Sequence, residues 1–141
     1  MRHASRWAAA LLAIGGLAVG GCNQSAVGTA APAGEKPAKV EAVAGSDSKR
    51  VVLTEQAVSR LGIETATVGQ RTVPYSALLY DVNGDTWVFE VTAPRTYQRT
   101  KVGVEVVDGE TVVLVSGPAP GRTVVTVGAA ALYGTELGTG A

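Results

Sequence analysis

The chain has 141 residues, and its 12 Lys and Arg balance its 12 Asp and Glu, so no surplus of positive charge favours binding to nucleic acid. It has one cysteine, Cys22, which excludes an intramolecular disulfide, and one histidine, His3. Eighteen glycines and many valines favour strands joined by turns, so we expect a mainly all-β fold.

The first 21 residues are organised like a secretory signal. A basic start with Arg2 and Arg6 precedes the apolar run Ala8–Val19, and small residues lead to Cys22. The apolar run is shorter than the roughly 20 residues that a transmembrane helix needs. A cysteine directly after small residues resembles the lipobox of bacterial lipoproteins. An ordinary signal peptide followed by an incidental cysteine is the alternative.

The lipobox resemblance implies that residues 1–21 are removed and that Cys22 carries a diacylglycerol, which binds the protein to membrane lipid. His3 would be lost with the signal, so the mature chain would have neither an imidazole nor a free thiol. Catalysis by His or Cys and soft metal sites would then be excluded. We therefore expect an extracytoplasmic protein, lipid-anchored to a bacterial cell membrane, with no catalytic residues, no cofactor and no metal site.

Residues 22–50 predict a flexible linker that begins with the lipidated cysteine. They are rich in Ala, Gly, Pro and Ser, lack aromatic residues and carry charges of both signs. So few apolar side chains cannot offset the entropy lost on ordering. We expect this segment to tether a folded domain of residues 51–137, with residues 138–141 as a tail.

The first part of that domain carries signals for a strand, a short helix and another strand. Val51–Leu53 predicts a strand, and Ile63–Val68 alternates apolar and polar residues as strands do. Between them, Thr54 is a typical N-cap and Gly62 a typical C-cap, so we predict a helix over Glu55–Leu61.

The second part of the domain carries hairpin signals. The Asn-Gly pair within Asp81–Asp85 and the Asp-Gly pair at 108–109 each separate two apolar runs, which predicts two β-hairpins. The expected strands, the last of which follows a Gly/Pro-rich turn, are Ser76–Tyr80, Thr86–Val91, Val102–Val107, Thr111–Val115 and Thr123–Val127. Together with the short helix, these elements predict a small antiparallel β-barrel or β-roll.

The first hairpin turn also resembles part of a calcium-binding loop. Asp81, Asn83 and Asp85 match the first three ligand positions of that loop. Thr86 and Thr92, however, stand where the loop requires a glycine and a bidentate carboxylate. We therefore interpret these residues as a hairpin turn.

Arg95, Tyr97, Arg99 and Lys101 alternate along one extended segment, so a strand would place them on the same face. One interpretation is a contact strip for an acidic partner surface or for anionic lipid headgroups. The other is a solvated strand face that prevents an edge from pairing with a wrong strand. Three carboxylates show no spacing typical of an acid–base site, and we expect them to be surface charges: Glu90, Glu105 and Glu110.

From Val73 onward the chain resembles a known family. The stretches that carry the resemblance are VPYSALL, NGDTWVF, VDGETVVLVSG and PGRTVVTVGAAALYGTELG. They resemble the C-terminal, membrane-proximal domain of HlyD-type periplasmic adaptor (membrane fusion) proteins, and VVLTEQAVSRLGIETATVG is similar to a segment near the start of such adaptors. The resemblance implies a small β-roll or barrel that docks on the periplasmic face of an efflux transporter permease. The lipid anchor of that family agrees with Cys22.

One departure from the family is large. A full adaptor carries a lipoyl-like domain and usually a long helical hairpin where this chain has only residues 70–72, and the chain contains no coiled-coil heptads. We therefore expect a reduced adaptor, an accessory subunit or a remnant of an adaptor, which docks on an efflux transporter without forming a tunnel. The alternative is a solitary envelope lipoprotein that binds a small ligand or a cell-wall component. The sequence does not decide between a monomer and a homo-oligomer.

Overall fold

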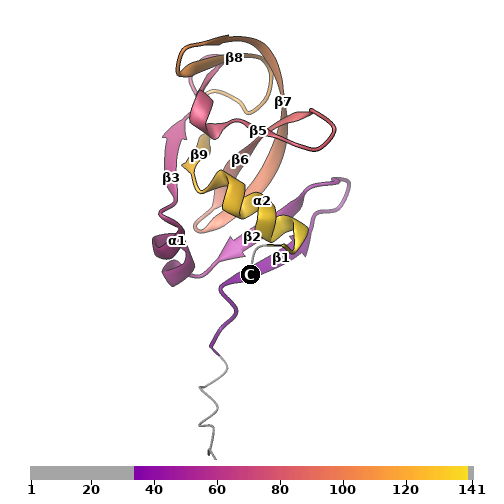
Figure 1. Ribbon diagram of the computed structural model, residues 1–141, viewed down its shortest axis with the longest axis vertical. Helices are drawn as coiled ribbons and strands as arrows, with labels where there is room; N and C mark the ends of the chain where they lie inside the picture. The colour runs from indigo at the N-terminus through magenta and orange to yellow at the C-terminus, as the bar shows by residue number, and fades with distance from the viewer. Residues whose placement is uncertain (1–33, 140–141) are drawn as a thin grey trace, which may run out of the picture. The chain divides into compact units, whose positions relative to one another are not determined.

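The computed structural model describes residues 34–139, in which nine antiparallel strands form a curled sheet and two short helices pack against one of its faces (Figure 1). The all-β class expected from the composition is confirmed. Cys22 and the predicted signal segment lie outside the described residues. Neither helix within the described range is long and apolar enough to cross a bilayer.

Strand β7 (Thr96–Asp108) is the longest element, and its two halves pair with different strands. Its first half lies between β2 (Lys49–Leu53) and β6 (Thr86–Ala93). Its second half pairs with β8 (Thr111–Ser116) across a two-residue turn, as the second hairpin signal predicts. The strand therefore joins the half of the sheet covered by helices to the half that curls over.

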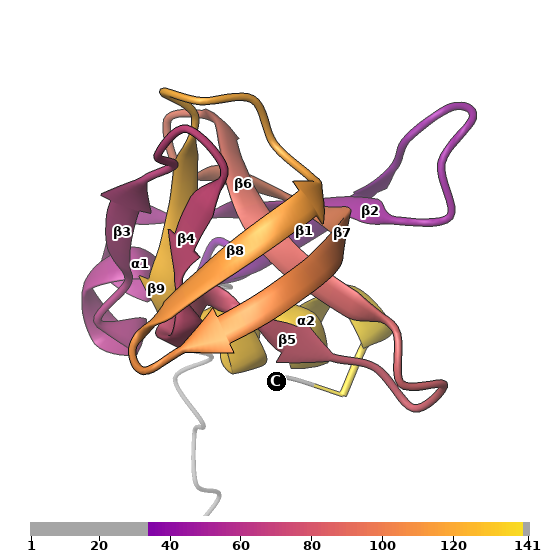
Figure 2. The same ribbon diagram turned by 90° about the horizontal axis from the view of Figure 1, so that it is seen from above.

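The other strands extend this arrangement on both sides in the order β1-β2-β7-β6-β9-β3, while β4 pairs with β8 and β5 with β6. They are β1 (Ala38–Ala42), β3 (Glu64–Thr67), β4 (Thr72–Pro74), β5 (Leu79–Tyr80) and β9 (Thr123–Val127). Figure 2 shows the curl that brings β3 and β4 towards each other, but the sheet does not close. The fold is thus an open roll. Strand β4 has only three residues and ends at Pro74, which has no N–H to donate to a neighbouring strand.

Side chains from the two faces of β6 enter two separate hydrophobic clusters. Val88 points into the curl of the sheet and Phe89 points towards the helices, and both are fully buried. The cluster inside the curl contains Val68, Val73, Ala77, Leu78, Val88, Val102, Val112, Leu114 and Val124. The cluster under the helices contains Val51, Leu53, Ala57, Phe89, Tyr97, Val125, Ala129 and Leu132.

Helix α1 (Glu55–Leu61) begins and ends where its capping residues predict. The Thr54 hydroxyl oxygen accepts the backbone N–H of Ala57 at 3.2 Å, which satisfies one of the free donors of the first turn. Gly62 adopts φ 59° and donates its N–H to the carbonyl of Ser59. Both caps are local interactions, which explains why the sequence alone located this helix.

Helix α2 (Ala129–Leu137) is an element that the sequence analysis missed. It starts after Gly128 and contains Gly134, and a glycine inside a helix costs about 1 kcal/mol relative to alanine. The helix forms because it packs on the sheet: Leu132 is fully buried and Ala129 is 5% exposed in the cluster under the helices. Its stability therefore comes from tertiary contact more than from local propensity.

The prediction that residues 22–50 form a flexible linker is wrong for their described part. Strand β1 pairs along its whole length with β2, from Ala38 opposite Leu53 to Ala42 opposite Lys49. The segment contributes few apolar side chains, but β2 pairs with the backbone groups on the inner edge of β1, and Ala38 packs against the cluster under the helices. The folded domain therefore begins well before residue 51.

The strand predicted over Ser76–Tyr80 is shorter than expected. Its first residues belong to a 3₁₀ turn, Tyr75–Ala77, and only Leu79–Tyr80 pairs with β6. Ala77 is fully buried inside the curl, so the turn folds the chain inward before the hairpin begins.

Replacement of Phe89 tests the central position of β6. We expect Phe89→Ala to lower the free energy of unfolding by about 3–5 kcal/mol, because it leaves a cavity between the sheet and both helices. Val82→Ala is the control, because Val82 is 96% exposed in the β5–β6 turn and should change stability by less than about 0.5 kcal/mol. Urea denaturation of both variants measures the difference, and equal stabilities would contradict the packing described above.

Candidate functional site

The predicted contact strip of Arg95, Tyr97, Arg99 and Lys101 is not a continuous exposed surface. Tyr97 is 4% exposed and belongs to the cluster under the helices, and the side chain of Arg99 is 10% exposed. The alternation along β7 is present, but α2 covers the middle of that face, and the sequence analysis did not include this helix. The strip is therefore wrong at its two central residues.

Arg99 has a structural role between the sheet and α2. Its guanidinium carbon lies 4.2 Å from the ring centroid of Trp87 and 4.9 Å from that of Tyr133, so the cation stacks between two aromatic faces. Its Nε lies 3.0 Å from Oε2 of Glu136. The other carboxylate oxygen of Glu136 accepts the backbone N–H of Lys49 at 2.9 Å, which ties the same helix to β2.

Removal of the cation should cost more stability in the buried pair of Arg99 and Glu136 than in an exposed ion pair. We expect Arg99→Ala to lower the free energy of unfolding by about 3–5 kcal/mol, because it leaves Glu136 as an uncompensated buried charge. Lys101→Ala should cost less than about 1 kcal/mol, since the ion pair of Lys101 with Asp85 is about half exposed. Chemical denaturation of the two variants gives both values; a smaller loss for Arg99→Ala would contradict the structural role.

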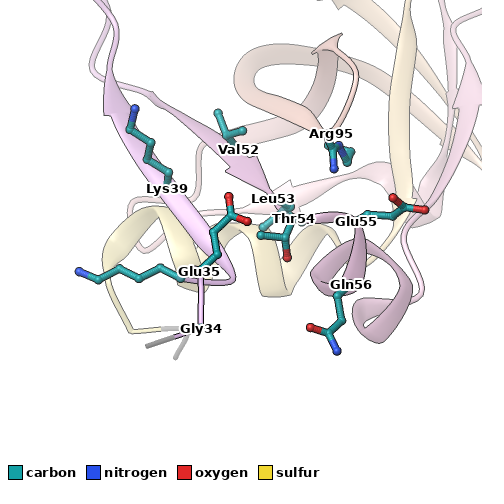
Figure 3. A pocket seen from close by; sticks show the side chains of 10 residues that line it. Gly34, Glu35, Lys39, Val52, Leu53, Thr54, Glu55, Gln56 and Arg95 are labelled. Carbon is teal, nitrogen blue, oxygen red and sulfur yellow. The ribbon is translucent and has the colours of Figure 1, made fainter. Parts of the chain in front are cut away.

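Arg95, at the end of the predicted strip, lies in the turn between β6 and β7 with φ 56°. Its carbonyl accepts the N–H of Leu53 at 2.9 Å, and it lines an open hollow of about 490 Å³ (Figure 3). Carboxylates and cations from separate segments surround this hollow, and Lys39 and Glu55 point to opposite sides of it (Figure 3). Such a mixed, divergent set of charges supports no particular catalytic chemistry.

In the turn that resembles a calcium loop, groups of the same hairpin bind the carboxylate of Asp81. Oδ1 of Asp81 accepts the N–H groups of Asn83 and Asp85 at 2.8 and 3.0 Å, and Oδ2 accepts the indole N–H of Trp87 at 3.0 Å. Desolvation raises the pKa of Asp81, but these hydrogen bonds outweigh it and hold the pKa below its ordinary value. Within residues 34–139 no group of three or more His, Cys, Asp or Glu side chains is gathered as metal ligands would be. The hairpin-turn interpretation fits this geometry.

Glu90 is not the surface charge that we expected, since it is only 8% exposed. Arg122 forms an ion pair with its carboxylate, and the hydroxyl of Thr100 donates to Oε2 at 3.2 Å. The carboxylate is thus compensated by a cation and a hydrogen bond, which favours a structural role.

The outer face of the β7–β8 hairpin carries an exposed apolar surface that the sequence analysis did not identify. Val106 is 50% exposed and Val115 is 63% exposed, and the half-buried Val113 lies directly opposite Val106. We call these three residues the valine patch. Strict alternation would place Val106 on the same face as Val102, but register shifts on either side of Val104 turn it outward.

A charged pair borders the valine patch on one side. Arg71 forms an exposed ion pair with Glu105 and donates its Nε–H to the carbonyl of Leu114 at 2.9 Å. On the other side, a Cβ on Gly103 would lie 2.6 Å from Cγ2 of Val115, so the absent side chain leaves room for that valine. An apolar centre with a polar border is the usual anatomy of a protein-binding surface.

A second apolar surface lies between the helices and β1. It is a groove of about 240 Å³, lined by Pro37, Ala38, Leu53, Ala57, Arg60, Leu61, Ala131, Gly134 and Thr135. Small-molecule sites typically enclose about 300–1,000 Å³, so this groove is smaller than a typical site of that class. Inside the curl of the sheet, buried side chains form the first hydrophobic cluster.

Comparisons with protein-family models, curated proteins and solved structures found no match to this chain. Lipid attachment at Cys22 stays a prediction, because that residue lies outside the described part of the chain. The functional conclusion therefore depends on the sequence signals and on the valine patch.

Proposed function

We propose that the protein is a lipid-anchored, non-catalytic extracytoplasmic module that docks on an efflux transporter through the valine patch. The observation that carries this proposal is the exposure of Val106 and Val115 on the outer face of the β7–β8 hairpin. Exposed apolar surface with a polar border favours contact with another protein. The resemblance to the membrane-proximal domain of HlyD-type adaptors supports a transporter permease as that protein.

A lipid anchor at Cys22 would keep the domain within reach of a membrane-bound partner. The β7–β8 hairpin lies at the end of the domain opposite the point where the described chain begins (Figure 1). From Cys22 to Gly34 even a fully extended chain spans at most about 40 Å. With the lipid at Cys22, the start of the domain would stay within this distance of the bilayer.

The valine patch replaces the predicted contact strip as the docking surface. Arg99 was expected in the contact strip, but its buried ion pair with Glu136 means that substitution there would disturb the fold before it disturbed a partner. Val106 and Val115 can be replaced without removing a buried side chain, so they are the better positions for a test of docking.

Charged substitutions in the patch test the docking surface. We expect Val106→Asp with Val115→Asp to lower recovery of a permease at least tenfold, because a carboxylate in an apolar contact is desolvated without a partner. The measurement is crosslinking in intact cells, affinity isolation of the tagged full chain and mass spectrometry of the membrane proteins recovered with it. Val82→Asp, at a more exposed valine outside the patch, should recover the permease like the unmodified chain.

Two results would count against this function. Unchanged recovery with both aspartates present would exclude the patch as the docking surface. Absence of any permease with the unmodified chain would exclude docking itself. In that case the groove between α1 and α2 favours the alternative of a solitary lipoprotein, and native mass spectrometry should show a small compound bound to the protein.

A further inference from the structure

Strand β1 lies at one end of the sheet, and within residues 34–139 its outer edge pairs with no other strand. The free N–H and C=O groups of such an edge are a template for another strand. A shallow hollow of about 440 Å³ follows this edge and is lined by Glu35, Lys36, Ala38, Lys39 and Val40. The edge is therefore both unpaired and open.

The side chains of β1 form a short charge pattern that is complementary to the same strand running antiparallel. Lys39 and Glu41 share one face, with Nζ of Lys39 2.8 Å from Oε1 of Glu41, and their side chains are 76% and 36% exposed. Val40, between them, points to the other face and is 39% exposed. A cation, an apolar residue and an anion thus follow one another along a free edge.

We propose that two copies of this chain pair through their β1 edges, antiparallel, about a two-fold axis at Val40. In this register Lys39 lies opposite Glu41 of the partner subunit, and Glu41 opposite Lys39 of the partner subunit. Val40 lies opposite Val40 of the partner subunit. Directly opposite residues with opposite charges stabilise a strand pair, and the two-fold symmetry produces that contact twice.

The charges also select this arrangement over the others. Parallel pairing in register would place Lys39 opposite Lys39 and Glu41 opposite Glu41, which is unfavourable. In an antiparallel register shifted by one residue, Lys39 and Glu41 of one copy would lie beside the apolar residues of the other copy, without a charged partner. Charges on an edge strand usually prevent pairing, whereas Lys39 and Glu41 permit one specific pairing with a second copy.

The pair would form at the end of the domain where the described chain begins (Figure 1). A contact over five residues is small, and small interfaces are weak between freely diffusing proteins. Confinement to a membrane, which rests on the proposed lipid anchor, raises the effective concentration of the copies. Both valine patches lie at the opposite end of the domain and stay exposed in the pair.

A cysteine at the symmetry axis tests the pairing directly. In the full chain expressed in cells, Val40→Cys places two thiols opposite each other with Cα atoms about 4.5–5.5 Å apart, within the range of a disulfide. After mild oxidation we expect a disulfide-linked dimer on a non-reducing gel. The matched control is Val82→Cys, a more exposed valine outside the edge, and the chain without an added cysteine reports any crosslink through Cys22.

Charge exchange then tests the register. In the Val40→Cys background, Lys39→Glu or Glu41→Lys alone should lower the dimer yield at least about fivefold, because each makes all the facing charges alike. Coexpression of these two variants should restore a mixed dimer, and Lys39→Glu combined with Glu41→Lys should restore the self-pair. Circular dichroism of each purified variant shows that the fold is retained.

The proposal is overturned if Val40→Cys crosslinks no more than Val82→Cys, or if the charge changes leave its yield unaltered. The assay needs no transporter, so failure of docking at the valine patch would leave this result intact. Conversely, Val106→Asp with Val115→Asp should leave the disulfide yield of Val40→Cys unchanged.

Discussion

The ion pair between Arg99 and Glu136 is the contact on which much of the domain depends. It joins the middle of β7 to α2, and stacking of the guanidinium between Trp87 and Tyr133 extends the contact to β6 and to the helix itself. Glu136 also accepts the N–H of Lys49, so the same carboxylate holds the start of β2. Each buried charge has its partner in place, so removal of either one would leave the other uncompensated.

The position of α2 decides which surfaces remain available. By covering the face that carries Tyr97 and Arg99, it removes the polar strip as a binding surface. Two other surfaces stay open at opposite ends of the domain: the valine patch on the β7–β8 hairpin and the free edge of β1 (Figure 1). One is apolar and suits a different protein, whereas the other has a charge pattern complementary to itself. This separation would let one copy dock and self-associate at the same time.

Local signals in the sequence were reliable where one or two neighbouring residues determine the backbone. Thr54 and Gly62 bound α1 because their capping interactions reach only three residues along the chain. The Asn-Gly and Asp-Gly turns located both hairpins, since a tight turn sets the pairing of the strands beside it. The identity of the outward valines was missed, because a β-bulge changes which face a residue occupies and depends on the partner strand.

By itself, the sequence determined the all-β class, α1 and the two hairpins. Only the tertiary structure decided that β1 is ordered, that α2 forms, and that Arg99 is buried while Val115 is exposed. The physical reason is the range of the interactions. Caps and turns act within a few residues, whereas the N–H of Lys49 reaches Glu136 across 87 positions of the chain, a contact that no local pattern encodes.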